Sequence, residues 1–314
     1  MPELLSRYAE SIFWMARYIE RAENLARILD VSASSAGGQS HADEWRTVLR
    51  VNSDEERFSA LGHPAVADRI LHFYVLDDDN PTSIRTSIRA AFENARSLRP
   101  FISAEMWTQL NIFQKWLREQ NTAALSPSTL PRLLERVKSD CQTHTGIAEG
   151  TFHRDQGWLF YRMGRYIERA DQTTRLLDAR FIHHSGTSEA NSPLESGHWG
   201  ATLHCAAGYH AFRRVHPTGM VPAEIAGFML LHPEFPRSVA LCVGETDRLL
   251  STLRSRYGLR GGIAAIERLD GIKAALFQRM TDTLRTETLH DLLDWLQTQL
   301  IPTTESVAAD FFGR

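Results

Sequence analysis

The sequence predicts an all-α protein, a helical bundle built from two tandem helical repeats related by a pseudo-twofold axis. Three observations lead to this prediction. Apolar residues recur every three or four positions along most of the chain, which is the period of an α-helix. Alternating β-type patterns are scarce, and FMLLH at 228–232 is too short to indicate a sheet. The hexapeptide RYIERA occurs twice, at 17–22 and at 165–170.

The first predicted helix is long and begins near the N-terminus. Eight apolar residues in alternating steps of three and four share one face of this helix: Leu5, Tyr8, Ile12, Met15, Ile19, Ala22, Ala26 and Leu29. The small side chains of Ala22 and Ala26 would let a neighbouring helix approach closely. Asp30 and the Ser/Gly-rich segment at 32–40 are expected to end the helix and form a loop.

Later helices follow from the same period. Helical spacing is found at 65–76, 83–98, 104–117, 130–137 and 287–300. The glycine-rich segment YGLRGGI, which follows another helical stretch, is expected to be a turn.

Two prolines are typical of helix starts. Pro81 and Pro236 suit the first position of a helix, and Asn80 suits the N-cap before the first of them. Ser83 and Ser238 would then lie inside the first turn.

The two hexapeptides belong to a longer duplication. Around them, residues match in register: Met15 with Met163, Glu23 with Asp171, Arg27 with Arg175, and Asp30 with Asp178. A second block, 73–84, parallels 228–239. We interpret the chain as one helical domain, 1–314, with repeats of about 1–147 and 148–314. Duplicated hairpins usually pack about a pseudo-twofold axis, so the two RYIERA helices are expected to be adjacent and antiparallel.

Charged residues form a ridge on each RYIERA helix. Glu20, Glu23 and Arg27 are spaced at i, i+3 and i+7, with Arg17 one turn before Glu20. The second copy carries the equivalent residues Arg165, Glu168, Asp171 and Arg175. A neighbouring ridge carries Arg21 in the first copy and Arg169 in the second. If the twofold holds, up to four carboxylates and several guanidinium groups converge near the axis.

The charged ridges allow several interpretations. Glu23 and Arg27 can form an ordinary ion pair on a solvated face, worth about 0.3–0.5 kcal/mol. Flanking aromatic residues such as Trp14 and Tyr18 favour burial instead, either as a structural network or as a ligand-binding site. The carboxylates at 20–23 and 168–171 could offer oxygen ligands to Mg²⁺. Because the adjoining arginines oppose a cation, no cofactor is expected and magnesium is only an alternative.

Composition excludes some classes of partner and does not suggest others. The net charge of −3 does not favour binding to nucleic acid. No apolar run approaches the length of a membrane span and no signal peptide is evident, so no membrane partner and a cytoplasmic location are expected. Cys141, Cys205 and Cys242 match no metal or redox motif and are expected to be reduced, partly buried thiols.

Three segments of the chain resemble the bacterial alpha-E domain family. They are LLSRYAESIFWMARYIERAENLARILD at 4–30, DNPTSI at 79–84 and RDQGWLFYRMGRYIERADQTTRLLD at 154–178. The family is all-helical and is named for a glutamate, whose matching positions here are Glu20 and Glu168. One departure is Ala16, where a glycine is common.

The resemblance implies partners more than a mechanism. Alpha-E proteins are encoded beside, or fused to, circularly permuted ATP-grasp proteins, often near a transglutaminase-like peptidase. The implied pathway makes and trims amide bonds in a peptide or peptide-tagged metabolite. Any ATP-driven ligation would therefore belong to a partner.

The leading hypothesis is an accessory or partner subunit of an ATP-grasp amide ligase, holding a carboxylate- or phosphate-bearing peptide or small-molecule intermediate in a cleft. Anion binding is assigned to Arg17, Arg21, Arg165 and Arg169. Glu20 and Glu168 would orient these arginines or receive a substrate amine. The remaining predicted site residues are Glu10, Trp14, Glu23 and Asp171.

Two other hypotheses stay open at this point. In one, the chain is an enzyme in which Glu20 or Glu168 is the general base of amide transfer or of magnesium-assisted hydrolysis. In the other, the chain is a helical scaffold without a pocket.

Overall fold

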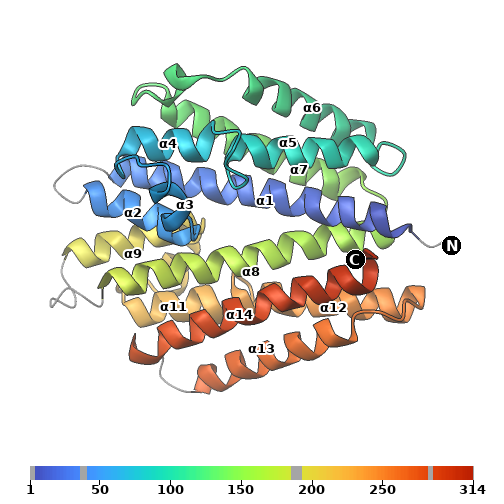
Figure 1. Cartoon of the computed structure of the whole chain (residues 1–314). Coiled ribbons are helices and arrows are strands. Elements are labelled where there is room, and N and C mark those ends of the chain that lie inside the picture. Colours follow the sequence, from blue (N-terminus) through green and yellow to red (C-terminus); the bar gives the residue numbers. More distant parts are fainter. Residues whose placement is uncertain (1–3, 36–40, 185–192, 282–285, 314) are drawn as a thin grey trace. The chain divides into compact units, whose positions relative to one another are not determined.

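The computed structural model describes residues 4–35, 41–184, 193–281 and 286–313 (Figure 1). All regular secondary structure in these ranges is helical, which confirms the predicted all-α class. The helices are α1 (Ser6–Ser35), α2 (His41–Val51), α3 (Glu55–Ser59), α4 (Ala67–Val75), α5 (Ile84–Ser97), α6 (Ala104–Arg118), the 3-10 helix η1 (Thr122–Leu125), α7 (Leu130–Thr151), α8 (Gln156–His184), α9 (Pro193–Cys205), α10 (Tyr209–Val215), α11 (Pro222–Leu231), α12 (Val239–Tyr257), α13 (Ile263–Thr281) and α14 (Thr286–Phe311).

The chain divides into two compact units, Met1–Arg165 and Tyr166–Arg314. The division lies inside α8, so the first turns of that helix belong to the first unit. The predicted repeat boundary between residues 147 and 148 lies earlier, near the end of α7. The organisation into two repeats stays a prediction.

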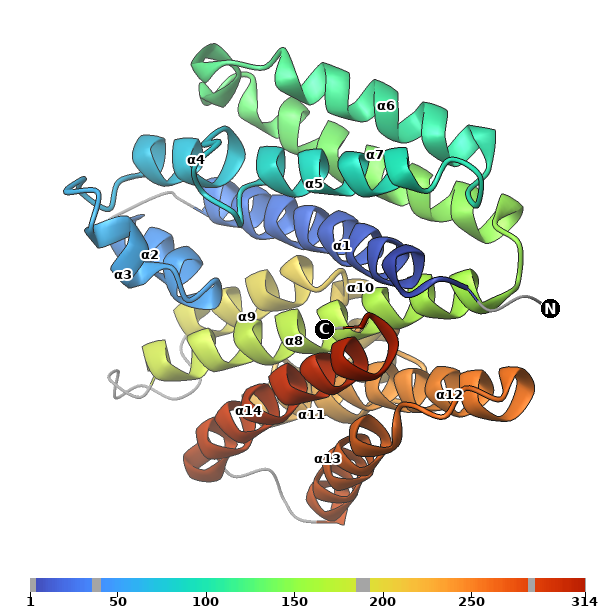
Figure 2. The ribbon, with the colours of Figure 1, turned by 45° about the vertical axis from the view of Figure 1, so that its right-hand side comes forward.

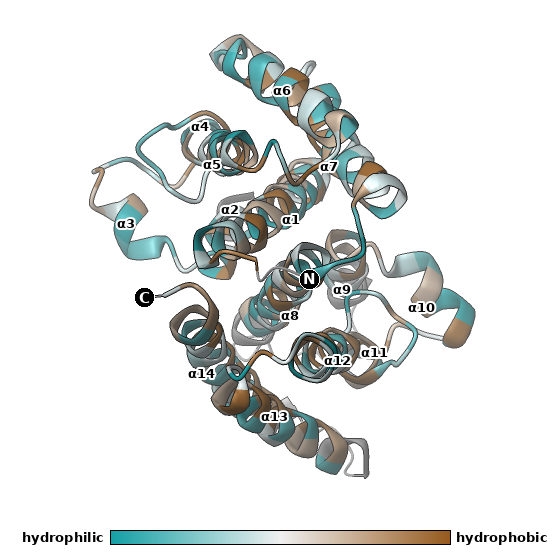
Figure 3. Cartoon of the chain, turned by 90° about the vertical axis from the view of Figure 1, so that its right-hand side faces the viewer, coloured by the Kyte–Doolittle hydropathy of each residue, from teal (hydrophilic) through white to brown (hydrophobic). Residues whose placement is uncertain are grey.

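Helix α1 is the central element of the first unit. It packs along α5 and α7, and α6 packs against both of these helices (Figures 1 and 2). Phe13 and Leu29 of α1, Tyr74 of α4 and Phe113 of α6 are almost completely buried. Each such side chain contributes about 1.5–3 kcal/mol when it leaves water. The outer helix α6 carries both hydrophilic and hydrophobic residues, as an amphipathic helix at an edge should (Figure 3).

Helix α1 is longer than predicted. It continues to Ser35, so the expectation that the loop begins at residue 32 is wrong, and residues 36–40 lie outside the described part of the chain. Contacts from elsewhere in the sequence support the extra turn. Lys138 Nζ of α7 lies 2.8 Å from Oδ2 of Asp30, and the buried Ser32 hydroxyl donates to Glu44 at 3.2 Å.

The predicted starts of α5 and α12 are three residues too early. Ser83 and Ser238 do not lie inside the first turn but are the N-caps of these helices. Their Oγ atoms accept from the backbone N–H groups of Thr86 at 3.1 Å and Leu241 at 3.2 Å. Asn80 closes the preceding turn by accepting from the Thr82 N–H at 3.0 Å. A polar side chain before a proline can serve either purpose, and only the path of the chain decides between them.

The second unit has its own core. Helix α12 packs against α11 and α13, and α13 packs against α14 (Figure 2). Trp199 of α9, Phe212 of α10 and Leu250 of α12 are almost completely buried. The segment at 228–232 forms the C-terminal end of α11 and the residue after it. YGLRGGI makes the predicted turn, and Gly258 ends α12 in the left-handed conformation.

Two further observations concern the cysteines and the apolar character of the helices. None of Cys141, Cys205 and Cys242 forms a disulfide, and all three are buried rather than partly buried as expected. Across the described ranges, no helix combines the length and apolar character needed to cross a lipid bilayer.

Candidate functional site

The carboxylates of the first RYIERA ridge are buried. Glu20 is 2% exposed, Glu23 is 4% exposed and Arg17 is also buried. The interpretation as a solvated face is therefore wrong for this ridge. Apolar residues flank these positions along α1, and the helices that pack on α1 cover the charges together with them. Burying an ion costs several kcal/mol unless a partner compensates, so the contacts of each charge matter.

Glu23 has a close partner on its own helix. Arg27 Nη2 lies 2.8 Å and Arg27 Nε 3.2 Å from Glu23 Oε1, which confirms the predicted i, i+4 pair. Gln142 of α7 adds a longer contact of 3.4 Å to the same oxygen. This carboxylate is therefore held by two helices.

Glu20 faces the first residue of the second RYIERA hexapeptide. Arg165 Nε lies 3.7 Å from Glu20 Oε2, and Arg165 Nη1 lies 3.5 Å from Glu149 Oε1. Both distances are long for a hydrogen bond, and Arg165 Nε makes none within the described part of the chain. The Arg165 side chain is 12% exposed and that of Glu149 is 46% exposed, so this guanidinium spans from a buried carboxylate to a surface one.

The first turns of α8 approach the backbone of α1 closely. A Cβ atom on Gly164 would collide with the carbonyl oxygen of Phe13, and one on Gly157 would lie 3.1 Å from Cδ1 of Ile12. Ala16, the departure from the family pattern, is fully buried and accommodates its methyl group. The close approach therefore depends on the glycine of α8, which brings Arg165 within reach of α1.

These first turns of α8 run in the same direction as α1. The contacts follow the same order along both helices. The Gln156 side-chain oxygen accepts from the backbone N–H of Leu4, Gly164 lies against the backbone of Phe13, and Arg165 lies near Glu20. The expectation that the two hexapeptide helices are antiparallel is wrong for this segment. A pseudo-twofold axis makes helices antiparallel only when it is perpendicular to them, and the sequence does not specify the direction of such an axis.

Three uncharged titratable side chains surround this charge cluster. Cys141 and His144 of α7 and Tyr161 of α8 are fully buried. Burial, reinforced by the positive charge of Arg165, lowers the pKa of His144 to about 4, and burial raises the pKa of Tyr161 to about 12. Burial and the carboxylates Glu23 and Glu20 raise the pKa of the Cys141 thiol.

All three groups are therefore neutral at pH 7. Sequence reasoning missed them, although Val137, Cys141, His144 and Ala148 are spaced as the buried face of a helix. That spacing is the signal that could have found Cys141 and His144.

The half-buried edge of α1 carries the other predicted residues of the first copy. Glu10, Trp14 and Arg21 are each partly exposed. The guanidinium carbon of Arg17 lies 4.8 Å from the centre of the Trp14 ring, and that of Arg21 lies 5.8 Å from the centre of the Tyr18 ring. Stacking on an aromatic face holds a guanidinium flat with its N–H edges directed outward.

The second RYIERA ridge, in the second unit, has similar local contacts. Glu168 is fully buried and Asp171 is nearly so. Arg175 Nε lies 2.9 Å from Asp171 Oδ2, a pairing like that of Arg27 with Glu23 in the first unit. Arg169 Nη1 donates to the carbonyl oxygen of Pro236 at 3.5 Å, and Gln172 Nε2 lies 3.5 Å from Glu168 Oε1.

No metal centre is found in the described ranges. Within them, no group of three or more His, Cys, Asp or Glu side chains is arranged to hold a metal ion. The magnesium alternative therefore receives no support from this geometry. The first unit instead offers a loosely paired guanidinium, a group suited to carboxylates and phosphates.

Comparison with known proteins identifies one family. The Alpha-E family, described as a predicted alpha-helical domain with a conserved ER motif, matches residues 4–312. Similar curated proteins include uncharacterized ones from Mycobacterium bovis and Mycobacterium tuberculosis, with 25–26% identity over 280 residues. The match covers 81% of this chain but 30% of each relative, so the chain spans less than a third of their length. No solved structure matches the chain.

Proposed function

The chain belongs to the Alpha-E family, and from this premise we propose that it is an accessory or partner subunit of an ATP-grasp amide or peptide ligase system. In this proposal it binds a carboxylate- or phosphate-bearing peptide or intermediate, and a circularly permuted ATP-grasp protein in the cytoplasm supplies the ATP-driven step. A transglutaminase-like peptidase is a further proposed partner.

The observation that carries the anion-binding part is the loose pairing of Arg165. Its two ion-pair distances of 3.5 and 3.7 Å leave the guanidinium without a saturating partner. One of its partners, Glu149, is a surface residue that an incoming anion can displace. A ligand carboxylate or phosphate would then bind the planar fork with two parallel N–H···O bonds.

The remaining residues take supporting roles in this proposal. Glu20 holds Arg165 from the buried side and so orients it toward the surface. Arg17 and Arg21, each close to an aromatic ring, extend the positive edge along α1. In the second unit, Glu168 would take the role of Glu20 and Arg169 that of Arg21.

The proposal of a partner is supported by the length of the relatives. In each of them the matched region is less than a third of a longer polypeptide. In these relatives the matched region has further protein beside it in the same polypeptide, and this supports the proposal of a partner.

The proposal is tested by combining the chain with the ATP-grasp protein encoded in the same genome. We expect the two to co-purify and the chain to raise the amide-ligase rate. Replacing Arg165 with Gln should weaken anionic substrate binding by about ten- to a hundredfold, because charge-assisted hydrogen bonds contribute about 1.5–3 kcal/mol. Arg165→Lys keeps the charge but loses the planar fork, and it should show an intermediate loss.

A matched control separates binding from stability. Arg96, in an exposed pair with Glu93, is replaced with Gln and should leave both complex and rate unchanged. Melting curves identify any variant that fails to fold. The absence of a complex together with an unchanged ligase rate would end the proposal.

A further inference from the structure

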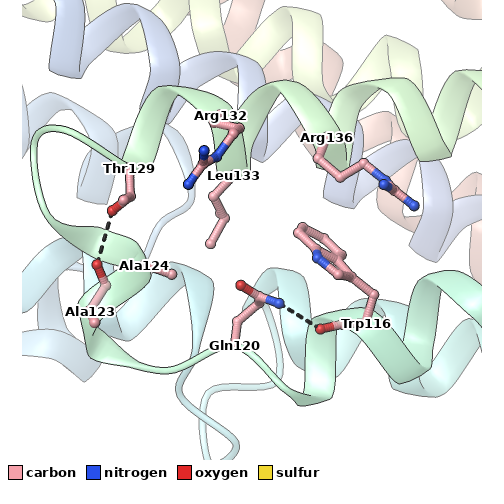
Figure 4. A pocket seen from close by; sticks show the side chains of 8 residues that line it. All are labelled: Trp116, Gln120, Ala123, Ala124, Thr129, Arg132, Leu133 and Arg136. Atoms are coloured by element: carbon pink, nitrogen blue, oxygen red, sulfur yellow. Dashed lines mark hydrogen bonds between the residues drawn. The ribbon is translucent and has the colours of Figure 1, made fainter.

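A cleft in the first unit lies apart from the charge cluster described above. It is formed by α6, η1 and α7 and has a volume of about 440 Å³ (Figure 4). This size is typical of sites for small organic molecules, which occupy cavities of roughly 300–1,000 Å³. The side chains that line it decide which class of molecule would fit.

One wall of the cleft is apolar and firmly held. The indole of Trp116 stacks on Phe113, with ring centres 6.2 Å apart and planes 25° from parallel. The buried Leu133 and the methyl group of Ala124 complete the apolar surface. A flat hydrophobic surface of this kind favours a planar aromatic group, because stacking adds to the burial of apolar area.

Two arginines of α7 line the cleft, and only one of them forms an ion pair with a described residue. Arg136 Nε lies 2.6 Å from Asp140 Oδ2, and the guanidinium of Arg136 lies over the Trp116 ring at 5.4 Å. Arg132, one turn earlier, makes no ion pair or hydrogen bond with any described residue. In Figure 4 its guanidinium is directed from α7 toward η1, whereas that of Arg136 extends past the indole.

The opposite side of the cleft offers an acceptor. Gln120 Nε2 donates to the carbonyl oxygen of Trp116 at 2.8 Å, which leaves Oε1 directed into the cleft (Figure 4). Thr129 Oγ1 donates to the carbonyl oxygen of Ala123 at 2.9 Å and so secures the η1 end. The polar groups available to a ligand are therefore one guanidinium fork and one amide oxygen.

We propose that this cleft binds a small planar aromatic molecule that carries a carboxylate or a phosphate. The aromatic ring packs against the side chains of Trp116 and Leu133. The anionic group binds the guanidinium of Arg132, and a polar hydrogen of the ligand binds Gln120 Oε1. The site is independent of the Arg165 cluster, so the two proposals can fail separately.

Calorimetric titration of the full chain tests this site with three probes: benzoate, phenyl phosphate and neutral benzamide. We expect at least one anion to bind about tenfold or more tightly than benzamide. In the Arg132→Gln variant that preference should disappear, since losing one charge-assisted contact costs about a factor of ten. Arg96→Gln, in the exposed pair with Glu93 and outside the cleft, is the matched control and should retain the preference.

The two anionic probes show which anionic group the natural ligand carries. Tighter binding of benzoate indicates an aromatic carboxylate, and tighter binding of phenyl phosphate indicates a phosphorylated aromatic molecule. Trp116→Leu should weaken all three probes alike, with circular dichroism confirming its helix content. The proposal is overturned if none of the probes binds, if benzamide binds as well as the anions, or if Arg132→Gln leaves anion binding unchanged.

Discussion

Arg165 Nε lies 3.7 Å from Oε2 of Glu20, so the first residue of the second RYIERA hexapeptide lies beside a glutamate of the first. The Glu20 carboxylate is almost completely buried and therefore needs a compensating charge. Arg165 supplies that charge without forming a saturated, bidentate pair. The same contact thus serves the interior of the first unit and leaves donor capacity at its surface.

Replacing Glu20 with Gln should destabilise the first unit strongly. The change leaves the guanidinium of Arg165 without its buried counter-charge, and breaking such a pair costs about 3–5 kcal/mol. Urea unfolding measures the loss. Glu93→Gln, in the exposed pair with Arg96, should change the free energy of unfolding by less than about 1 kcal/mol. Equal effects of the two changes would show that the Glu20 contact has no special role.

Replacing Gly164 with Ala should also destabilise the first unit, for a steric reason. The new methyl group meets the backbone carbonyl of Phe13, which cannot move aside as a flexible side chain would. Overpacking of this kind costs about 1–3 kcal/mol.

A second glycine provides the control in the same unfolding experiment. Gly146, inside α7, faces open space, and a methyl group added there would meet no atom within 4 Å. Gly146→Ala should therefore stabilise the helix by up to about 1 kcal/mol. If Gly164→Ala is also stabilising, the close approach of α8 to α1 is incorrect.

The two capping serines should contribute equally. Besides accepting from the helix, Ser83 Oγ donates to the carbonyl of Asp77 and Ser238 Oγ to that of His232, both at 2.7 Å. Changing either serine to Ala should cost about 0.5–2 kcal/mol in thermal unfolding. Ser97→Ala, at an exposed position, should have little effect. Costs that differ widely between the two caps would contradict their structural equivalence.

Stability should fall in mild acid because of His144. Its pKa of about 4 in the folded chain lies below the ordinary value of 6.5, so the unfolded chain binds the proton more readily. The stabilisation is fully present above pH 6.5 and is lost as the pH falls toward 4, by about 3 kcal/mol in total. Urea unfolding between pH 4 and pH 8 measures this dependence, and His144→Gln should reduce its slope.

His290 provides a control of opposite sign. Its hydrogen bond to Asp178 raises its pKa, so its contribution is present below pH 6.5 and disappears as the pH rises. Because the side chain is half exposed, His290→Gln should change stability by less than about 1 kcal/mol, and only at low pH. An unchanged acid slope in His144→Gln would contradict the assignment.

Sequence patterns were sufficient for the helices and for the local pair on α1. Residues at i, i+3 and i+4 share a helix face whatever lies opposite, so the Glu23–Arg27 pair and the apolar face of α1 from Ile12 to Leu29 followed directly. Leu5, which was assigned to the same face, lies before α1 and is exposed. The capping serine of α5 was misplaced because Asn80 and Ser83 both carry oxygens suited to a cap. That of α12, Ser238, was misplaced because Pro236 suits the first position of a helix. Their roles depend on where the chain leaves the preceding turn.

The sequence by itself determined that this protein is helical, that it belongs with the Alpha-E proteins and that charges line its repeated motif. Only the tertiary structure decided that those charges are buried, that α8 begins parallel to α1, and that His144 and Tyr161 lie near Arg165 while Cys141 lies near Glu20 and Glu23. The reason is physical: periodicity assigns a residue to a face of its own helix, whereas burial and neighbours depend on other helices encoded elsewhere in the chain.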